Sequence, residues 1–203
     1  MINTIIFDLG NVLINWDPKL LYNQIFDSEE KTNHFLENIC TLTWNEEQDA
    51  GRSLEAGTAA LIKEYPEHKK EIEAYYDRWV EMLNGPIEGT VGIFRKLKES
   101  GKYKFYALTN WSAELFPVAL REFDFLTWFD GIVVSGDEGI RKPHPDFYRI
   151  VFNRYQVKPE DALFIDDNLR NVEAARKMGI RSIRFTSAEE LEKELQDLGV
   201  LSS

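Results

Sequence analysis

The sequence predicts an α/β fold, a parallel β-sheet with helices on both faces. A buried-strand pattern, Thr4–Phe7, ends directly at a carboxylate, Asp8. From residue 86 onward, strand and helix patterns alternate, which is typical of parallel sheets. Residues 17–85, in contrast, contain helical patterns and no convincing strand. We therefore expect a Rossmann-like core with a small all-helical cap inserted after the first strand.

These patterns divide the chain into residues 1–16 and 86–203 as the core, and residues 17–85 as the cap. In the cap, Asp17-Pro18 predicts a helix start. A second helix is predicted by a stripe of Ile72, Tyr75, Tyr76, Trp79 and Leu83. In the core, the patterns predict strands over residues 103–108, 131–134, 162–165 and 182–185, and helices over residues 113–120, 145–155, 168–177 and 188–198.

Composition narrows the possible functions. The chain has 203 residues, with 43% hydrophobic and 29% charged residues, as expected for a globular protein. Its formal net charge of -11 argues against nucleic acids and anionic membranes as partners. An anionic small molecule remains compatible with this charge, because a metal ion or a single lysine can reverse the local field.

The chain carries one cysteine, Cys40, which cannot form an intramolecular disulfide. We expect it to be a core residue. No stretch approaches 18 apolar residues, and no basic region opens the N-terminus as in a leader peptide. These observations lead us to expect a cytoplasmic location.

Polar side chains gather at the predicted strand ends. Asp8 follows the first strand, Thr109-Asn110 the second, and Asp166-Asp167 a later one, while Lys142 lies in the loop after residues 131–134. Because the carboxyl ends of parallel strands share one edge of the sheet, these groups should converge on one cleft. They form a coherent chemical set of a nucleophile, a hydroxyl, a cation and a pair of acids.

The acids indicate a magnesium site. Asp8 and one of Asp166 and Asp167 offer the hard oxygen ligands that Mg²⁺ prefers, together with a backbone carbonyl and waters. Lys142 would oppose the ionised nucleophile and the oxygens of a bound phosphate. Thr109 and a backbone N–H would hold another phosphate oxygen.

The chain resembles the haloacid dehalogenase-like hydrolase superfamily. FDLGNVL is similar to the first motif of that family, LTN to its second, RKP to its third and FIDDNLRN to its fourth. The resemblance implies that Asp8 is a nucleophile forming a covalent intermediate, and that Thr109 and Lys142 contact the phosphate. It implies Asp167 as the closer Mg²⁺ ligand, with Asp166 in a supporting role.

One position departs from the family pattern. The phosphatases of the family usually carry a second Asp two positions after the nucleophile, where it protonates the leaving group and then activates water. Here that residue is Gly10. Its backbone carbonyl can still bind the metal, but the general acid is missing. The principal hypothesis is a Mg²⁺-dependent phosphatase acting on a small phosphomonoester such as a sugar phosphate.

Two alternatives stay open. A 2-haloacid dehalogenase using Asp8 needs neither metal nor a general acid, because halide leaves without a proton. The paired acids Asp166 and Asp167 argue against it, since without a cation they would raise the pKa of a neighbouring carboxylate. The second alternative is a non-catalytic module that binds a phosphate or a metal.

Several other residues are candidates for the substrate pocket. A polar cap segment, WNEEQDAGR, contains Asp49 and Arg52 and can face the cleft, where Arg52 would hold a second anionic group. Trp16 and Trp111 follow the first two motifs closely and would line the pocket. Glu138 would orient Lys142 through an ion pair.

Overall fold

Five parallel strands form the central sheet of the computed structural model, which describes residues 1–202. Across the sheet the strand order is β5-β4-β1-β6-β7. The strands are β5 (Gly131–Val134), β4 (Lys104–Thr109), β1 (Thr4–Phe7), β6 (Ala162–Asp166) and β7 (Arg181–Arg184). With β1 at its centre, paired in parallel with both β4 and β6, the sheet confirms the predicted Rossmann-like α/β class.

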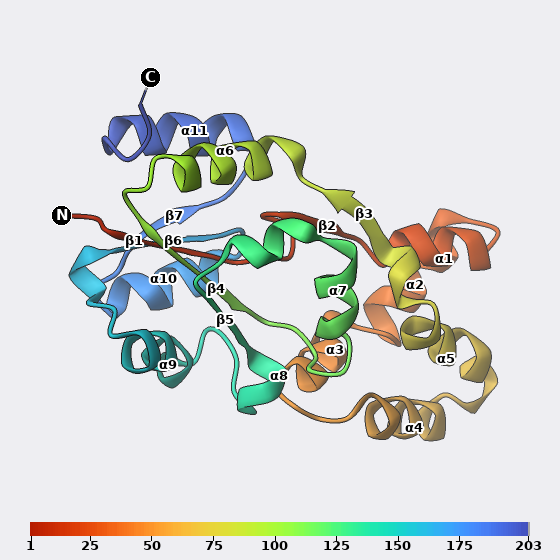
Figure 1. The fold of residues 1–203 in the computed structure, drawn as a ribbon. Helices are drawn as coiled ribbons and strands as arrows, with labels where there is room; N and C mark the ends of the chain where they lie inside the picture. Colours follow the sequence, from red (N-terminus) through yellow and green to blue (C-terminus); the bar gives the residue numbers. More distant parts are fainter. Residues whose placement is uncertain (203) are drawn as a thin grey trace.

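Helices cover both faces of this sheet (Figure 1). They are α6 (Glu88–Glu99) and α11 (Ala188–Asp197) on one face, and α9 (Pro145–Tyr155) and α10 (Leu169–Lys177) on the other. The alternation of side chains along β1 explains the two layers. Ile5 and Phe7 pack with Phe94 of α6, whereas Ile6 packs with Phe147 of α9. A strand buried on both faces needs the continuous apolar run that the sequence shows.

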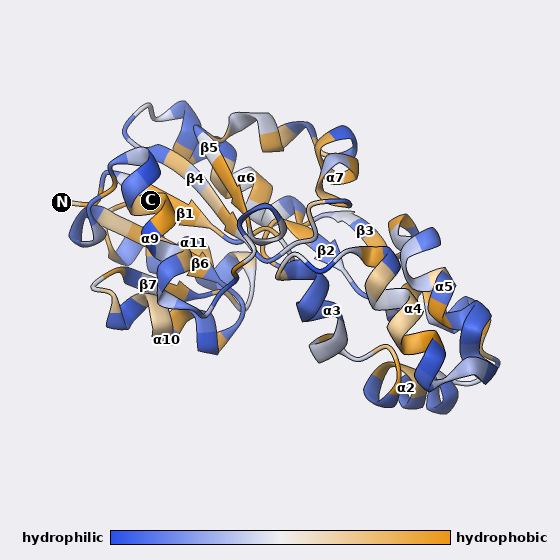
Figure 2. Cartoon of the chain, turned by 90° about the horizontal axis from the view of Figure 1, so that it is seen from below, coloured by the Kyte–Doolittle hydropathy of each residue, from blue (hydrophilic) through white to orange (hydrophobic). Residues whose placement is uncertain are grey.

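Between the first and second strands of the sheet, the chain forms five further helices, called here the inserted helices. They are α1 (Lys19–Ile25), α2 (Glu29–Asn38), α3 (Leu42–Asp49), α4 (Leu54–Glu64) and α5 (Lys69–Asp77). They extend to one side of the sheet, with α3 nearest to it (Figure 2). A short antiparallel pair, β2 (Ile14–Trp16) and β3 (Leu83–Pro86), joins them to the core.

Two sequence predictions for this region are wrong in detail. The predicted helical stripe reaches Leu83, but α5 ends at Asp77 and a short 3-10 helix, Trp79–Met82, follows it. Leu83 then lies in β3, opposite Trp16, although the sequence showed no strand there. The pairing with β2 supplies backbone partners that make this segment extended, a tertiary effect that helical periodicity does not encode.

The start of α1 is close to the prediction. Asp17 Oδ1 accepts a hydrogen bond from the backbone N–H of Lys19, at 2.9 Å. Asp17 therefore caps α1, although the N-cap position itself is occupied by the next residue, Pro18. Further along the chain, α7 (Phe116–Glu122) begins three residues later than predicted, and a single turn, α8 (Ser135–Glu138), follows β5.

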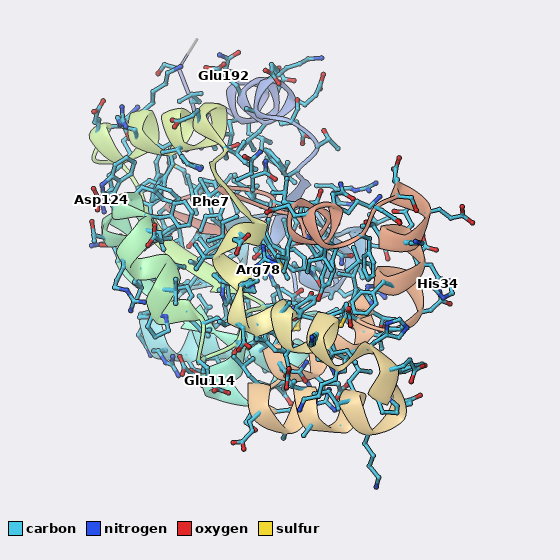
Figure 3. The ribbon with its side chains drawn as sticks, turned by 90° about the vertical axis from the view of Figure 1, so that its right-hand side faces the viewer. Phe7, His34, Arg78, Glu114, Asp124 and Glu192 are labelled. Carbon is cyan, nitrogen blue, oxygen red and sulfur yellow. The ribbon has the colours of Figure 1, made fainter. Side chains whose placement is uncertain are left out.

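The apolar core runs without interruption from the sheet into the inserted helices. Phe7, Phe94 and Phe105 belong to the same buried cluster as Tyr22 of α1 and Tyr75 of α5. In Figure 3 the side chain of Phe7 lies inside the molecule, whereas Arg78 and Glu114 lie nearer the viewer. This continuity holds the inserted helices against the edge of the sheet where the polar residues gather.

Within residues 1–202, no helix combines the length and the apolar character needed to cross a bilayer.

Candidate active site

Four elements bring the predicted polar residues together at the carboxyl edge of the sheet. Asp8 follows β1, Thr109 ends β4, Asp166 ends β6, and Lys142 lies in the loop after α8. The ammonium nitrogen of Lys142 lies 2.9 Å from Asp8 Oδ2 and 2.7 Å from Asp166 Oδ2. The convergence inferred from strand order is therefore present in the structure.

Lys142 is completely buried, which is unusual for a lysine. Burial acts to lower the pKa of its ammonium, but the carboxylates of Asp166 and Asp8 raise it more, so the net shift is upward. The lysine therefore stays charged inside the protein. Its charge holds the two carboxylates in fixed positions.

The negative charge in the site exceeds the positive charge. Asp8, Asp166 and Asp167 each place a carboxylate oxygen within 4.8 Å of the others, and Lys142 is the cation in contact with two of them. Burial raises the pKa of Asp8 to about 8, and the neighbouring acids add to this shift while Lys142 opposes it. The pKa of Asp167 is also raised, first by burial and then by Asp166. Ionisation of all three carboxylates would therefore require a further cation beside them.

The two adjacent acids have different surroundings. Asp166 is fully buried and accepts hydrogen bonds from the backbone N–H of Asn168, at 2.8 Å, and from the amide of Asn171, at 3.1 Å. Asp167 is less buried and is not engaged by the ammonium of Lys142 within ion-pair distance. The oxygens of Asp166 are therefore occupied by protein donors, which leaves Asp167 the more available carboxylate.

Thr109 and Asn110 contribute in different ways. The hydroxyl of Thr109 is buried and has no hydrogen-bond partner within the described residues. Such an orphaned donor is costly unless a ligand satisfies it. The side-chain amide of Asn110 instead bonds the backbone of Lys142 twice, accepting at 2.9 Å from its N–H and donating at 3.1 Å to its carbonyl. Asn110 therefore fixes the segment that carries the lysine.

A tight loop follows Asp8. The carbonyl of Leu9 accepts hydrogen bonds from the backbone N–H groups of Leu13 and Ile14, both at 2.9 Å, and Asn11 adopts a left-handed φ of 54°. Gly10 lies between Leu9 and Asn11 in this loop. A Cβ added at Gly10 would meet no heavy atom within 4 Å, so the space that a side chain would occupy there is open.

A cavity of about 80 Å³ lies next to Gly10. Gly10, Asn110 and Ser112 line it from the core, and Asn45 and Asp49 of α3 from the inserted helices. Its apolar lining is Trp16, Trp79, Trp111 and Leu115. Trp16 and Trp111, which the sequence predicts to line the substrate pocket, both line this cavity. The indole N–H groups of both are buried without a partner in residues 1–202.

Helix α3 is held against the core by charge and by close backbone contact. Glu46 pairs with Arg141 and with Arg170, each at 2.8 Å. At the end of the helix Gly51 has a φ of 100°, and a Cβ there would meet Gly136 and Gly139 at 3.3 Å. Sequence reasoning missed this docking, because helical periodicity does not show that Glu46 faces two arginines so distant in the chain.

The docking of α3 brings Asp49 to the cavity. Asn45 donates to Asp49 Oδ2 at 3.2 Å. Burial raises the pKa of Asp49 to about 7, although Arg141, the backbone N–H of Ser112 and Lys142 all act to lower it. A carboxyl group with such a pKa exchanges protons near neutrality.

Two predicted contacts differ from the structure. Arg52 bonds within the inserted helices, donating to Gln48 Oε1 at 2.6 Å and to the carbonyl of Trp44 at 3.3 Å. Glu138 pairs with Arg154 at 2.8 Å, so the predicted ion pair with Lys142 is wrong. The turn of α8 carries Glu138 toward α9, whereas Lys142 follows Gly139, whose left-handed φ of 66° redirects the chain.

Comparison with known proteins identifies the family. The model of the haloacid dehalogenase-like hydrolases matches residues 2–179, and the chain belongs to this family of hydrolases. The resemblance carried by the four motifs is therefore confirmed.

Two fungal proteins are among the similar curated relatives. The chain is 30% identical to the sesquiterpene phosphatase astK of Aspergillus oryzae over 195 residues, which are 95% of the chain and 94% of that protein. It is also 30% identical to the drimenol cyclase drtB of Aspergillus calidoustus, over 98% of the chain but only 37% of that longer protein.

A solved structure shares the fold. A HAD family enzyme from Bacteroides thetaiotaomicron, in complex with magnesium and inorganic phosphate, superposes with a TM-score of 0.71. The match covers 92% of this chain and 96% of the other, at 22% identity. At this identity the likeness concerns the fold.

The first prediction concerns the buried lysine. Lys142→Met leaves Asp8 and Asp166 without their cation, and removing one partner from a buried ion pair costs about 3–5 kcal/mol. We expect the free energy of unfolding, measured in urea without added metal, to fall by that order. The surface variant Lys177→Met serves as the control, and equal stability of the two variants would contradict the pairing.

A second prediction concerns Asp49 and pH. Its pKa is raised from 3.8 to about 7, so the folded state keeps a proton that the unfolded state loses. Wild-type stability therefore falls as pH rises from about 4 to about 7, and stays lowered above that range. Asp49→Asn removes this loss, so its stability relative to wild type should increase across that window. Thermal unfolding at pH 4, 5.5 and 8, with Glu47→Gln as the control, measures the difference, and a constant difference would contradict the shift.

Proposed function

We propose that this hydrolase is a Mg²⁺-dependent phosphatase that hydrolyses a small phosphomonoester through an aspartyl-phosphate on Asp8. The observation that carries the proposal is the cluster of Asp8, Asp166 and Asp167, three carboxylates within 4.8 Å of one another, of which Lys142 contacts only Asp8 and Asp166. Such a cluster needs a divalent cation to keep its nucleophile ionised at neutral pH. The phosphatase relative supports the same reaction class.

The donor set fits magnesium. The available groups are carboxylate oxygens of Asp8 and Asp167 and the backbone carbonyl of Gly10, all hard ligands. Within residues 1–202, the cluster consists of Asp8, Asp166 and Asp167 and includes no Cys or His, the ligands that favour other metals. Asp166 would not bind the ion directly but would position Lys142, which in turn contacts Asp8. When bound, the ion would neutralise charge shared by the carboxylates and the phosphoryl oxygens. The structural neighbour crystallised with magnesium and phosphate agrees with this choice.

The protein's own groups account for the first chemical step. Asp8 Oδ1 accepts from the N–H of Leu9 at 2.8 Å, and Oδ2 contacts Lys142, so the carboxylate is held in one orientation for attack on phosphorus. Lys142 stabilises charge on the phosphoryl oxygens. The unpartnered hydroxyl of Thr109 would donate to one of them, and the backbone N–H of Asn110 to another.

The cavity limits the leaving group. Its volume of about 80 Å³ is far below the roughly 300–1,000 Å³ of pockets that enclose drug-sized ligands. We propose a small organic group such as a sugar, packed on the indole rings. The inserted helices would act as the cap that closes over it and excludes water. Arg52 would hold a second anionic group if opening of this cap released it from Gln48.

The third prediction tests the nucleophile. Phosphate release from a panel of phosphomonoesters, with sugar phosphates and a prenyl monophosphate included, should require both Mg²⁺ and Asp8. Asp8→Asn should lose activity by at least about 10³-fold, because the substitution removes the proposed nucleophile. Thermal unfolding of the variant checks that it folds.

Contrary results would select the alternatives. Chloride release from 2-chloropropionate that persists in chelator would indicate a dehalogenase. Stabilisation by Mg²⁺ and phosphate without turnover of any ester would indicate a binding module.

The fourth prediction tests the metal ligand. Asp167→Ala should raise the Mg²⁺ concentration required for half-maximal activity by at least about tenfold, because it removes the most available carboxylate. Thermal stabilisation by Mg²⁺ alone gives a second readout without substrate. The exposed residue Glu173 on α10 provides the control, Glu173→Ala. An unchanged metal response in Asp167→Ala would remove this residue from the site.

A further inference from the structure

We propose that Asp49, carried by the inserted helix α3, is the general acid and base of this phosphatase, taking the role for which the first motif offers only Gly10. The inference rests on the proposed phosphatase function and deepens it. It assigns a catalytic residue outside the four motifs, on a different structural element.

The cavity geometry supports this assignment. Gly10 and Asp49 line the same cavity of about 80 Å³. A side chain at Gly10 would meet no neighbour within 4 Å, so the position leaves space beside the nucleophile. Asp49 is the carboxylic acid among the residues that line this cavity. A leaving group bound there would lie beside Asp49 and beside Gly10, two residues after Asp8.

The contacts of α3 make the position of Asp49 reproducible. Glu46, one turn earlier on the helix, is fixed by Arg141 and Arg170. Two residues after Asp49, the contact of Gly51 with Gly136 and Gly139 excludes any larger side chain without displacement. A third tie is the hydrogen bond from the N–H of Leu54 to Glu114, at 2.8 Å. The acid is therefore held from both sides at the core.

The surroundings of Asp49 suit proton transfer. Arg141 and Lys142 are the cations acting on it, Glu46 is the nearby acid, and Asn45 donates to one of its oxygens. Burial outweighs the cations and raises the pKa to about 7. Both forms of the carboxyl group are thus accessible in one catalytic cycle at neutral pH.

The proton balance closes over two steps. Asp8 attacks phosphorus, the bond to the ester oxygen breaks with its electron pair remaining on that oxygen, and the protonated Asp49 donates its proton to give a neutral alcohol. Water then attacks the aspartyl-phosphate, Asp49 accepts the proton from this water, and the bond from phosphorus to Asp8 breaks. Inorganic phosphate leaves, Asp8 is again a carboxylate and Asp49 is again protonated.

The fifth prediction uses two substrates of similar shape, phenyl phosphate and 4-nitrophenyl phosphate. Phenolate is a poor leaving group, with a conjugate acid pKa of about 10 like that of tyrosine, and needs a proton, whereas nitrophenolate leaves without one. Asp49→Asn keeps the size and neutral charge of the protonated acid. It should lower kcat/KM for phenyl phosphate by about 10²–10⁴-fold, and for 4-nitrophenyl phosphate by less than about tenfold.

The base role adds an independent signature. With 4-nitrophenyl phosphate, Asp49→Asn should release a burst of about one nitrophenol per enzyme and then turn over slowly, because the aspartyl-phosphate on Asp8 accumulates without a base to activate water. Intact-mass measurement would detect the phosphorylated protein. The control Glu47→Gln alters an exposed acid of the same helix and should behave like wild type.

The outcomes separate the two proposals. If wild type hydrolyses neither ester nor any other phosphomonoester, the phosphatase function fails. If wild type is active and Asp49→Asn loses kcat/KM equally for both esters, or loses nothing, Asp49 is not the acid. Asp49→Ser, with a smaller side chain, should reproduce the selective loss, and its failure to do so would also overturn the assignment.

Discussion

The buried ammonium of Lys142 is the interaction on which the rest of the site depends. It joins Asp8, at the end of the central strand β1, to Asp166, at the end of the neighbouring strand β6. Without it, two carboxylates would face each other in a nearly dry environment at a cost of several kcal/mol. One lysine cannot neutralise the third acid, Asp167, as well. The fold thus provides a stable arrangement that still lacks positive charge, and this deficit is the physical basis for a divalent cation.

Hydrogen bonds from polar side chains stabilise the positions of Lys142 and Asp166. Asn110 bonds both backbone groups of Lys142, and Asn171 donates to the carboxylate of Asp166. Ser135 similarly ties the end of β5 to the loop after β4, accepting from the N–H of Trp111 at 2.9 Å. Against this background, the unpartnered hydroxyl of Thr109 is conspicuous. A buried donor that has no protein partner is what a phosphate oxygen would require.

The sequence could predict the core of the site because it depends on strand order. Asp8 directly follows a strand, and Thr109 and Asp166 each end one. Parallel strands place their carboxyl ends at one edge whatever the details of packing. Predictions based on a single helical period were weaker. The helical spacing of apolar residues from Tyr75 to Leu83 continues past Asp77, where α5 ends. Leu83 instead pairs with Trp16 in a β-ladder, a contact between distant segments that the spacing does not reveal. The sequence around Asp49 likewise does not predict that this residue lines the cavity, since its position depends on how α3 packs against the core.

That docking has a mechanistic consequence. An acid at Gly10 would be present in the site whether or not the inserted helices covered it. On the proposed mechanism, the carboxyl group of Asp49 would reach the ester oxygen only while Glu46 pairs with Arg141 and Gly51 lies against Gly136. Proton delivery would then be coupled to closure over the substrate, which also excludes bulk water. Substrates too large for the aromatic cavity would hold α3 away from the core, and Asp49 would then be unable to donate a proton to their leaving group. On this proposal, the lack of an acid at Gly10 would let the inserted helices control which esters are cleaved.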